Sequence, residues 1–275
     1  LWSVFFQTAY KLSVAYVASV IFIERPLPVT RALPVQVRTV SAQPTVDLDQ
    51  ATTPNALDGL SLWLKSDTGV TYDGDGVSAW EDQSDNGNNA EQSAAAQRPA
   101  FVAHGLGTSP VLRFDGADDY LAIQNLSYSG AQAGLTIFVV VRSETDQAQV
   151  IISYDDGRYW QLALHDGAVN PRAGWQTADT AAVAHNLPSG RDLVDGNWHV
   201  VCGRFETTVT PGDDKQLVVD GVIVNEDNAH NGDDVGSGTR FGFIGAASQA
   251  TAFNNPTPAT GFLAGDVAEI VVYNR

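Results

Sequence analysis

The sequence is poor in cysteine, lysine and glutamate, and each shortage argues against a class of structure. The one cysteine, Cys202, leaves no partner for an intramolecular disulfide. It follows Val200 and Val201, a setting typical of a small buried hydrophobe, so we expect no redox or thiol chemistry. The chain holds three lysines, and aspartate outnumbers glutamate by 25 to 7. Because aspartate favours turns whereas lysine and glutamate favour helix surfaces, this bias argues against a helical protein.

Positive charge is also scarce. Lysine and arginine together number 15 against 32 acidic residues, and the formal net charge is -17 at pH 7. Such a field repels phosphate backbones and anionic lipid headgroups, so the composition argues against nucleic acid as a partner. Divalent cations and neutral glycans remain compatible with this charge.

Catalytic motifs are missing as well. The five histidines are scattered without metal-ligand spacing and no Gly-x-Ser-x-Gly turn is present, so neither zinc catalysis nor serine hydrolysis is indicated. Glycoside hydrolysis needs two carboxylates in one cleft, often delivered by acids that alternate along a strand. Asp266 and Glu269 are three residues apart, which predicts opposite faces, and Asp73 and Asp75 lie in a glycine-rich turn. We therefore expect no enzyme activity, with a glycoside hydrolase as the less favoured alternative.

The N-terminal segment, residues 1–23, is almost entirely apolar and has one charge, at Lys11. The uncharged run Leu12–Ile23 has the length of a signal-peptide core, which predicts a secretion signal or, with the rest of the segment, a membrane anchor. An assembly element that packs into neighbouring subunits and an ordinary packed segment are the alternatives. Membrane contact of residues 1–23 and self-assembly through residues 1–56 both remain open.

Residues 24–57 form a linker by composition. Five prolines are spaced through this segment, which prevents helix and favours an extended chain. The remaining residues, 58–275, are expected to form one globular domain, since large β domains reach this length as a single unit.

From residue 58 onward, short apolar or alternating runs are separated by glycine and aspartate turns. Alternation of apolar and polar residues along a run predicts a strand with one buried face. Asp220-Gly221 between two β-branched runs predicts a hairpin. So many strands in one block predict an all-β fold, with two antiparallel sheets packed as a sandwich. The predicted strands are 61–65, 111–114, 135–141, 150–154, 160–164, 198–205, 216–219, 240–244 and 266–273.

Five motifs, in a fixed order, are specific enough to indicate a family. They are Leu62–Val70 with Val77–Ala90, Pro110–Leu121, Asp195–Val201, Leu217–Gly221 and Gly265–Arg275. Together they resemble the bacterial laminin G-like domains, which are jelly rolls of the concanavalin A-like lectin and glucanase superfamily. The resemblance implies a jelly-roll sandwich over residues 58–275. Each motif also has an explanation as scaffold, and Trp198, for example, is expected to anchor the interface between the sheets.

The same resemblance implies a calcium site, because many laminin G-like domains bind calcium through loop carboxylates and backbone carbonyls. The candidate ligands are two pairs of adjacent aspartates in predicted loops, Asp118 with Asp119 and Asp155 with Asp156. Calcium takes about six to eight oxygen ligands, which several converging loops can supply. A solvated acidic turn is the alternative for each pair.

A carbohydrate site needs exposed aromatic rings beside amide and charged groups. The richest such stretch runs from residue 154 to 176. Rings at alternating positions of a strand are also typical of a core, which is the alternative for these aromatics. The predicted ligand-binding residues are Tyr154, Arg158, Tyr159, Trp160, Asn170 and Trp175.

Taken together, these features predict a secreted or cell-surface module for recognition or adhesion. Its expected partner is a glycan or an extracellular protein, and its candidate cofactor is calcium. The alternative is a structural subunit that residues 1–56 assemble into a surface filament or layer.

Overall fold

The computed structural model describes most of the chain from Thr53 to Asn274. The described ranges are 53–123, 134–154, 159–165, 173–178, 184–206, 214–227, 241–250, 252–255 and 260–274. In these ranges, no helix is long and apolar enough to cross a membrane. The apolar segment 1–23 and all but the end of the predicted linker lie outside the described residues, so the interpretations of both stay predictions.

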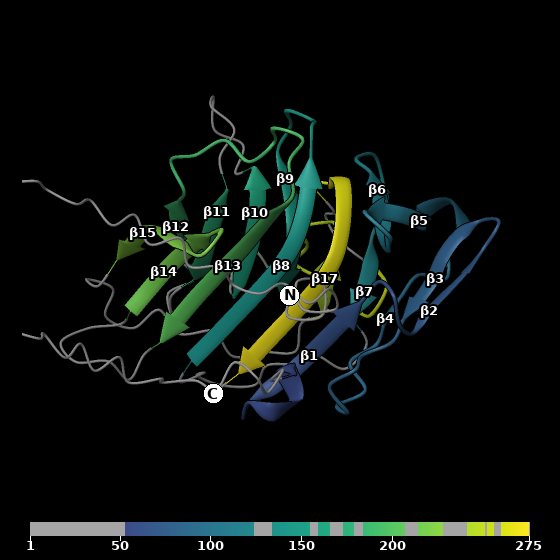
Figure 1. Cartoon of the computed structure of the whole chain (residues 1–275), viewed down its shortest axis with the longest axis horizontal. Coiled ribbons are helices and arrows are strands. Elements are labelled where there is room, and N and C mark those ends of the chain that lie inside the picture. Colours follow the sequence, from purple (N-terminus) through teal and green to yellow (C-terminus); the bar gives the residue numbers. More distant parts are fainter. Residues whose placement is uncertain are drawn as a thin grey trace, which may run out of the picture. The chain divides into compact units, whose positions relative to one another are not determined.

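The described chain forms two antiparallel sheets (Figure 1). Sheet A has the order β15-β14-β13-β8-β17-β6-β5, with β1 also paired to β17. Its strands are β1 Leu60–Lys65, β5 Ala100–Leu106, β6 Ser109–Asp115, β8 Gly134–Ser143, β13 His199–Glu206, β14 Asp214–Val219, β15 Val222–Asp227 and β17 Ala264–Asn274.

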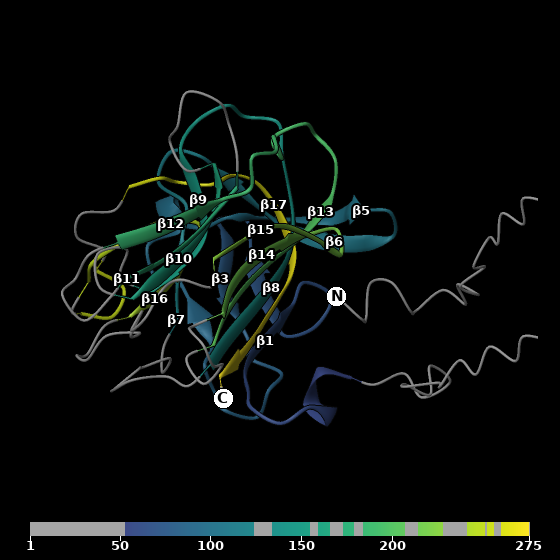
Figure 2. The same ribbon diagram turned by 90° about the vertical axis from the view of Figure 1, so that its left-hand side faces the viewer.

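Sheet B has the order β12-β11-β10-β9-β16-β7-β4-β3-β2. In Figure 2 its strands β10, β11, β12 and β16 lie in a separate layer from β8, β14 and β15 of sheet A. Two short 3-10 helices, η1 Pro54–Ala56 and η2 Ala95–Gln97, complete the described elements. The strands are β2 Val70–Asp73, β3 Gly76–Trp80, β4 Ala90–Glu91, β7 Leu121–Ile123, β9 Gln149–Tyr154, β10 Trp160–His165, β11 Gly174–Ala178, β12 Ala184–Pro188 and β16 Gly242–Ile244.

This arrangement confirms the predicted all-β, two-sheet antiparallel jelly-roll sandwich. Each of the nine predicted strands coincides with an observed one. The Asp220-Gly221 hairpin is also present: Val219 pairs with Val222, and φ is 53° at Asp220 and 78° at Gly221. Two consecutive positive φ angles match a type I′ turn, whose twist suits the flanking strands.

The core lies between the two sheets. It is filled by the side chains that the strands direct inward at alternate positions. In β1 and β17 these are Leu62, Leu64, Ile270 and Val272, all fully buried. The sandwich begins before residue 58, because the Tyr273 hydroxyl donates to the backbone carbonyl oxygen of Pro54 at 3.1 Å.

Trp175 of β11 extends toward sheet A and lies over Gly203 of β13. A Cβ atom at Gly203 would lie 2.7 Å from Cδ2 of the indole ring, so the missing side chain leaves room for the ring. The indole Nε1 donates to the carbonyl oxygen of Arg204 at 3.0 Å. The ring therefore ties sheet B to sheet A both by packing and by a hydrogen bond.

A bulge in β17 changes which residues face outward. The register with β8 shifts between Val267, which pairs with Val141, and Glu269, which pairs with Val140. Val267 and Ile270 both face the core, so Asp266 and Glu269 share the outer face of sheet A. The expectation of opposite faces is therefore wrong, because simple alternation does not count the extra residue of a bulge.

The outer face of sheet A is also largely apolar. Val111, Val140 and Ala268 form one buried cluster on it. Cys202 is 5% exposed, and burial raises the pKa of its thiol to about 12. The prediction that Cys202 is a buried small hydrophobe is confirmed. A second cluster on this face consists of Trp63, Val271 and Tyr273, and Trp63 Nε1 donates to the Glu269 carboxylate at 2.7 Å.

The substitution Gly203→Ala should lower the free energy of unfolding by about 1–3 kcal/mol, the usual cost of forcing extra volume into a packed core. Urea denaturation followed by tryptophan fluorescence measures this loss. Gly74→Ala is the matched control, because nothing lies within 4 Å of a Cβ atom there. Its effect should stay within about 0.5 kcal/mol. Equal effects of the two substitutions would contradict the packing of Trp175 against Gly203.

Candidate functional site

Three charged side chains form a row across the outer face of sheet A. Asp266 of β17 pairs with Arg113 of β6 on one side and with Arg142 of β8 on the other. On each of the three strands an adjacent residue lies in the core, so these three side chains point outward. The sheet register thus brings together residues that are 124 and 153 positions apart in the sequence.

Asp266 is buried, and both of its carboxylate oxygens accept hydrogen bonds. Arg113 donates from Nε at 2.6 Å and from Nη2 at 2.9 Å, a bidentate geometry, and Arg142 donates from Nη2 to the same carboxylate. Burial raises the pKa of Asp266, but the hydrogen bonds and charges of the two guanidinium groups outweigh it and hold the pKa below its usual value. The carboxyl group is therefore ionised at neutral pH.

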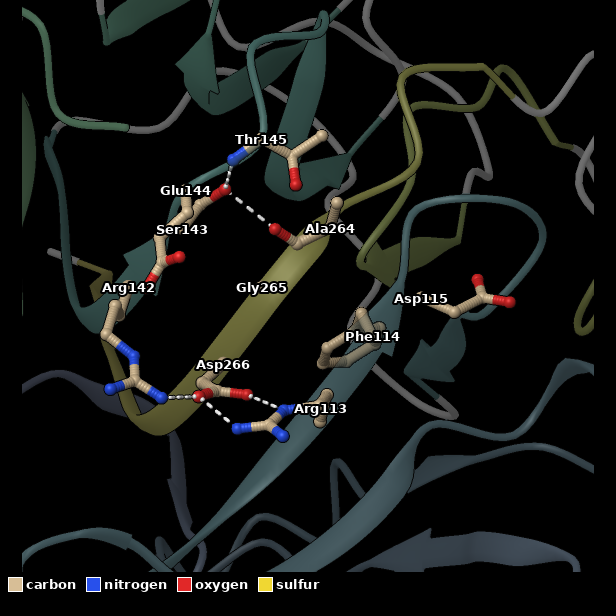
Figure 3. A pocket seen from close by; sticks show the side chains of 10 residues that line it. All are labelled: Arg113, Phe114, Asp115, Arg142, Ser143, Glu144, Thr145, Ala264, Gly265 and Asp266. Carbon is tan, nitrogen blue, oxygen red and sulfur yellow. Dashed lines mark hydrogen bonds and ion pairs between the residues drawn. The ribbon is translucent and has the colours of Figure 1, made fainter. Parts of the chain in front are cut away.

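The row borders a hollow of about 350 Å³ that opens to solvent. Figure 3 shows Asp266 between the two guanidinium groups at one end of it. At the other end the Ser143 hydroxyl donates to the carbonyl oxygen of Ala264 at 2.7 Å. Glu144, from the loop after β8, also lines the hollow and is exposed. Most of the lining is polar, which suits a ligand that forms hydrogen bonds.

Arg142 also contacts Trp198. The guanidinium carbon lies 5.1 Å from the ring centroid, within the range of a cation–π contact. Trp198 packs with the outer cluster around Val140 and not between the sheets. The expected role of Trp198 as an anchor of the sheet interface is therefore wrong. The core positions of this strand region are Val201 and Phe205, and alternation from them directs position 198 outward.

Asp115, Asp118 and Asp119 form an acidic cluster in the loop after β6. One carboxylate oxygen of each lies within 4.8 Å of the others. Asp115 Oδ1 accepts from the N–H groups of Ala117 and Asp118, and Asp119 Oδ2 accepts from that of Asp115. The structure thus brings Asp118 and Asp119 together, as a shared metal site requires. It adds Asp115, which the sequence presents as an ordinary Asp-Gly turn residue.

The pKa of Asp119 is raised to about 7. Burial is the largest cause, and the neighbouring carboxylates of Asp115 and Asp118 add to it, against a backbone hydrogen bond that lowers the pKa. A bound cation would favour the ionised form of all three groups. Asp115 also lines the hollow, so the acidic cluster and the hollow share one residue.

The four predicted ligand-binding aromatics are core residues. Tyr154, Tyr159, Trp160 and Trp175 are each 0% exposed. They pack against one another, with 5.1 Å between the ring centroids of Tyr154 and Tyr159 and 6.1 Å between those of Trp160 and Trp175. A fully buried ring offers no face to a sugar, so the alternative interpretation of these rings as core describes the structure.

The other predicted site residues lie outside the described residues. They are the ligand residues Arg158 and Asn170 and the metal ligands Asp155 and Asp156, and their roles stay predictions. The hollow itself was not predicted. A weak signal was present at Arg113, which occupies the outward position between two core residues of β6.

Comparison with known families gives one match. The Laminin_G_3 family model, described as "Concanavalin A-like lectin/glucanases superfamily", matches residues 115–275. This range contains the acidic cluster, Arg142 and Asp266. No curated protein matches the chain.

Several solved structures are similar to this chain. Domain 4 of AbnA, an extracellular arabinanase from Geobacillus stearothermophilus, in complex with arabinotriose, has a TM-score of 0.51 at 11% identity, over 78% of this chain and 92% of that chain. Domains LG4-5 of the mouse laminin alpha1 chain give 0.43 at 16% identity, over 64% and 44%. An endo-beta-1,4-glucuronan lyase from the fungus Trichoderma reesei gives 0.43 at 10% identity, over 78% and 93%.

The raised pKa of Asp119 predicts a specific pH dependence of stability. The folded chain keeps the Asp119 proton up to about pH 7, whereas the unfolded chain loses it near the ordinary value of 3.8. The stability that the protonated group contributes is therefore fully present below about pH 4 and is lost as the pH rises to about 7. Asp119→Asn keeps an acceptor for the Asp115 N–H group and should remove this loss.

Denaturant unfolding in chelator, at about pH 4.5 and about pH 7.5, measures the effect. Asp58→Asn, a change at an exposed aspartate, is the control. If Asp119→Asn lost as much stability as the unmodified chain between these pH values, the protonated state of Asp119 would be contradicted.

Proposed function

Since the chain belongs to the concanavalin A-like lectin/glucanases superfamily, we propose that it is a non-catalytic recognition module that binds a glycan at the hollow beside Asp266. The observation that carries the proposal is the hollow itself. It is open, polar and bordered by two guanidinium groups that a buried carboxylate holds in place. Side chains held in this way bind a ligand with little loss of conformational entropy.

The state of Asp266 supports a binding role over hydrolysis. Glycoside hydrolysis needs a carboxyl group that carries a proton at the working pH, together with a second carboxylate. Asp266 is ionised, and both of its oxygens are engaged by Arg113 and Arg142. Asp266 therefore has no proton to give to a leaving group.

A glycan ligand is favoured by the polar lining and by the fold. One protein that shares the fold is described in complex with arabinotriose, and it is described as extracellular. We extend both properties to this chain as part of the proposal: a glycan ligand, and a place outside the cell or on its surface. A protein ligand is the alternative that the binding experiment below decides.

Calcium is proposed as a cofactor at the acidic cluster. Three carboxylates within 4.8 Å of one another fit a hard cation, which prefers oxygen ligands. Asp115, Asp118 and Asp119 would supply three of the ligands. A cation there would neutralise their repulsion and hold the loop after β6 beside the hollow.

A structural subunit is the second candidate function. Sheet A carries apolar clusters on its outer face as well as its inner face, a property of sheets that are covered on both sides. The apolar composition of residues 1–23 suits self-assembly. Size-exclusion chromatography with and without residues 1–56 separates the two functions: large assemblies that disappear on truncation would favour the structural subunit.

Binding without turnover is the expected behaviour of the full chain on a glycan array. The chain should retain at least one oligosaccharide and release no new reducing ends from it. Arg142→Gln should weaken binding by about tenfold or more, because hydrogen bonds to charged groups contribute about 1.5–3 kcal/mol. Titration calorimetry measures the affinity, and Arg191→Gln, at an exposed arginine, is the control. New reducing ends, or equal affinity of the Arg142 variant, would refute the proposal.

Calcium should stabilise the folded chain by mass action, by about 2.7 kcal/mol at a free concentration a hundredfold above Kd. For a domain of this size that corresponds to a rise in melting temperature of roughly 5–10 °C. Melting curves in chelator, calcium, magnesium and sodium chloride separate a site from screening of the acidic surface. Asp118→Asn should abolish the calcium response, whereas Asp58→Asn should keep it. Equal shifts of the melting temperature in all three salts would contradict the calcium site.

A further inference from the structure

We propose that the hollow selects uncharged glycans over acidic ones, an inference that rests on the proposed function and specifies its ligand class. Three properties of the lining lead to this conclusion. They are its balance of charges, its pairing of unused donors with unused acceptors, and the fixed position of Arg142.

The charges around the hollow do not favour an anion. Arg113 and Arg142 face two carboxylates of the lining that the proposed cation does not neutralise, those of Glu144 and Asp266. The positive charge of the two arginines is directed largely at Asp266, which they bind from both sides. Because salt screens charges beyond about 8 Å, this local balance decides what enters, and the net charge of -17 adds a weak repulsion of anions.

The lining presents both donors and acceptors that other side chains leave unused. Among the described residues, Arg142 Nε and Nη1 and Arg113 Nη1 donate no hydrogen bond, since the bonds of both arginines run from other nitrogens to Asp266. The Glu144 carboxylate makes no hydrogen bond or ion pair with the described part of the chain.

A lining with both unused donors and unused acceptors suits the hydroxyl groups of a ligand better than its carboxylates or sulfates. A sugar hydroxyl donates one hydrogen bond and accepts others, so neighbouring hydroxyls can donate to Glu144 and accept from Arg142. An ionised carboxylate or sulfate only accepts, so near Glu144 it would meet like charge and lose hydrogen bonds. A neutral glycan uses both kinds of group in one hollow.

Arg142 is held before a ligand arrives. Arg142 lies between Asp266 and the ring of Trp198. Glu144 lies against Gly196, where a Cβ atom would come within 3.0 Å of Glu144 Cγ. The φ of Gly196 is +81°, a conformation that glycine adopts without strain. Arg142 therefore has a set position, and Glu144 lines the same hollow.

The experiment uses the full chain on an array of paired oligosaccharides that differ only in charge. One pair is galacturonan and its methyl ester, and the other is xylan with and without glucuronate side groups. Neutral arabinan, galactan and mannan fragments widen the search. The unmodified chain should bind neutral members at least tenfold more tightly than acidic ones, and the affinity for neutral members should change little with sodium chloride.

Glu144→Gln is the informative variant, because Glu144 is exposed and its loss leaves the ion pairs of Asp266 intact. The variant should bind neutral members several-fold more weakly and should shift the preference toward the acidic member of each pair. Glu226→Gln makes the same change of net charge at an exposed site on β15 and should leave the preference unaltered. A purely structural role of Glu144 would not move the ratio of the two affinities.

The outcomes distinguish a failure of the inferred preference for neutral glycans from a failure of the proposed function. Preference for neutral members with a shift in the Glu144 variant supports the inference. Tighter binding of acidic members, weakening as salt rises, would overturn it while the proposed function stands. Equal shifts in the Glu144 and Glu226 variants would also overturn it. Retention of no glycan on the array would refute the proposed function itself.

Discussion

The buried carboxylate of Asp266 is the interaction on which the rest of this surface depends. It joins three neighbouring strands, β6, β17 and β8, on the outer face of sheet A. A buried charge that loses its partners is costly, about 3–5 kcal/mol, so the two arginines are needed as long as the carboxylate is present. In return the carboxylate fixes two guanidinium groups at the edge of a hollow. Folding and the proposed binding thus rely on the same three side chains.

The sandwich supplies the positions that this interaction needs. The register of β17 with both neighbours places Asp266 directly between Arg113 and Arg142. The bulge that follows in β17 returns apolar residues to the core and leaves Glu269 outside, bonded to Trp63. At the far side of the core, Trp175 fits over Gly203 and fixes one sheet against the other. The register of β17 with β6 and β8 thus sets the positions of the charged side chains at the hollow.

Much of the fold could be predicted from the sequence, because alternation and turn residues act locally. The hairpin at Asp220-Gly221 is an example, since two adjacent residues specify it. The site could not be predicted in the same way. Pairing Asp266 with Arg113 requires the sheet register, the bulge after Val267 is invisible to simple alternation, and the aromatics near Trp160 look alike in sequence whether they line a core or a binding face.

The acidic cluster and the hollow meet at Asp115. A cation bound at the acidic cluster would therefore change the charge beside a ligand in the hollow. The central claim is that a glycan binds at the hollow beside Asp266. Nuclear magnetic resonance tests it most directly. The signals of the arginine side-chain Nε–H groups and of the backbone amides are followed while an oligosaccharide that the chain binds is added. The account predicts shifts at Arg113, at Arg142 and in the loop from Ser143 to Thr145. Shifts confined to sheet B would contradict it.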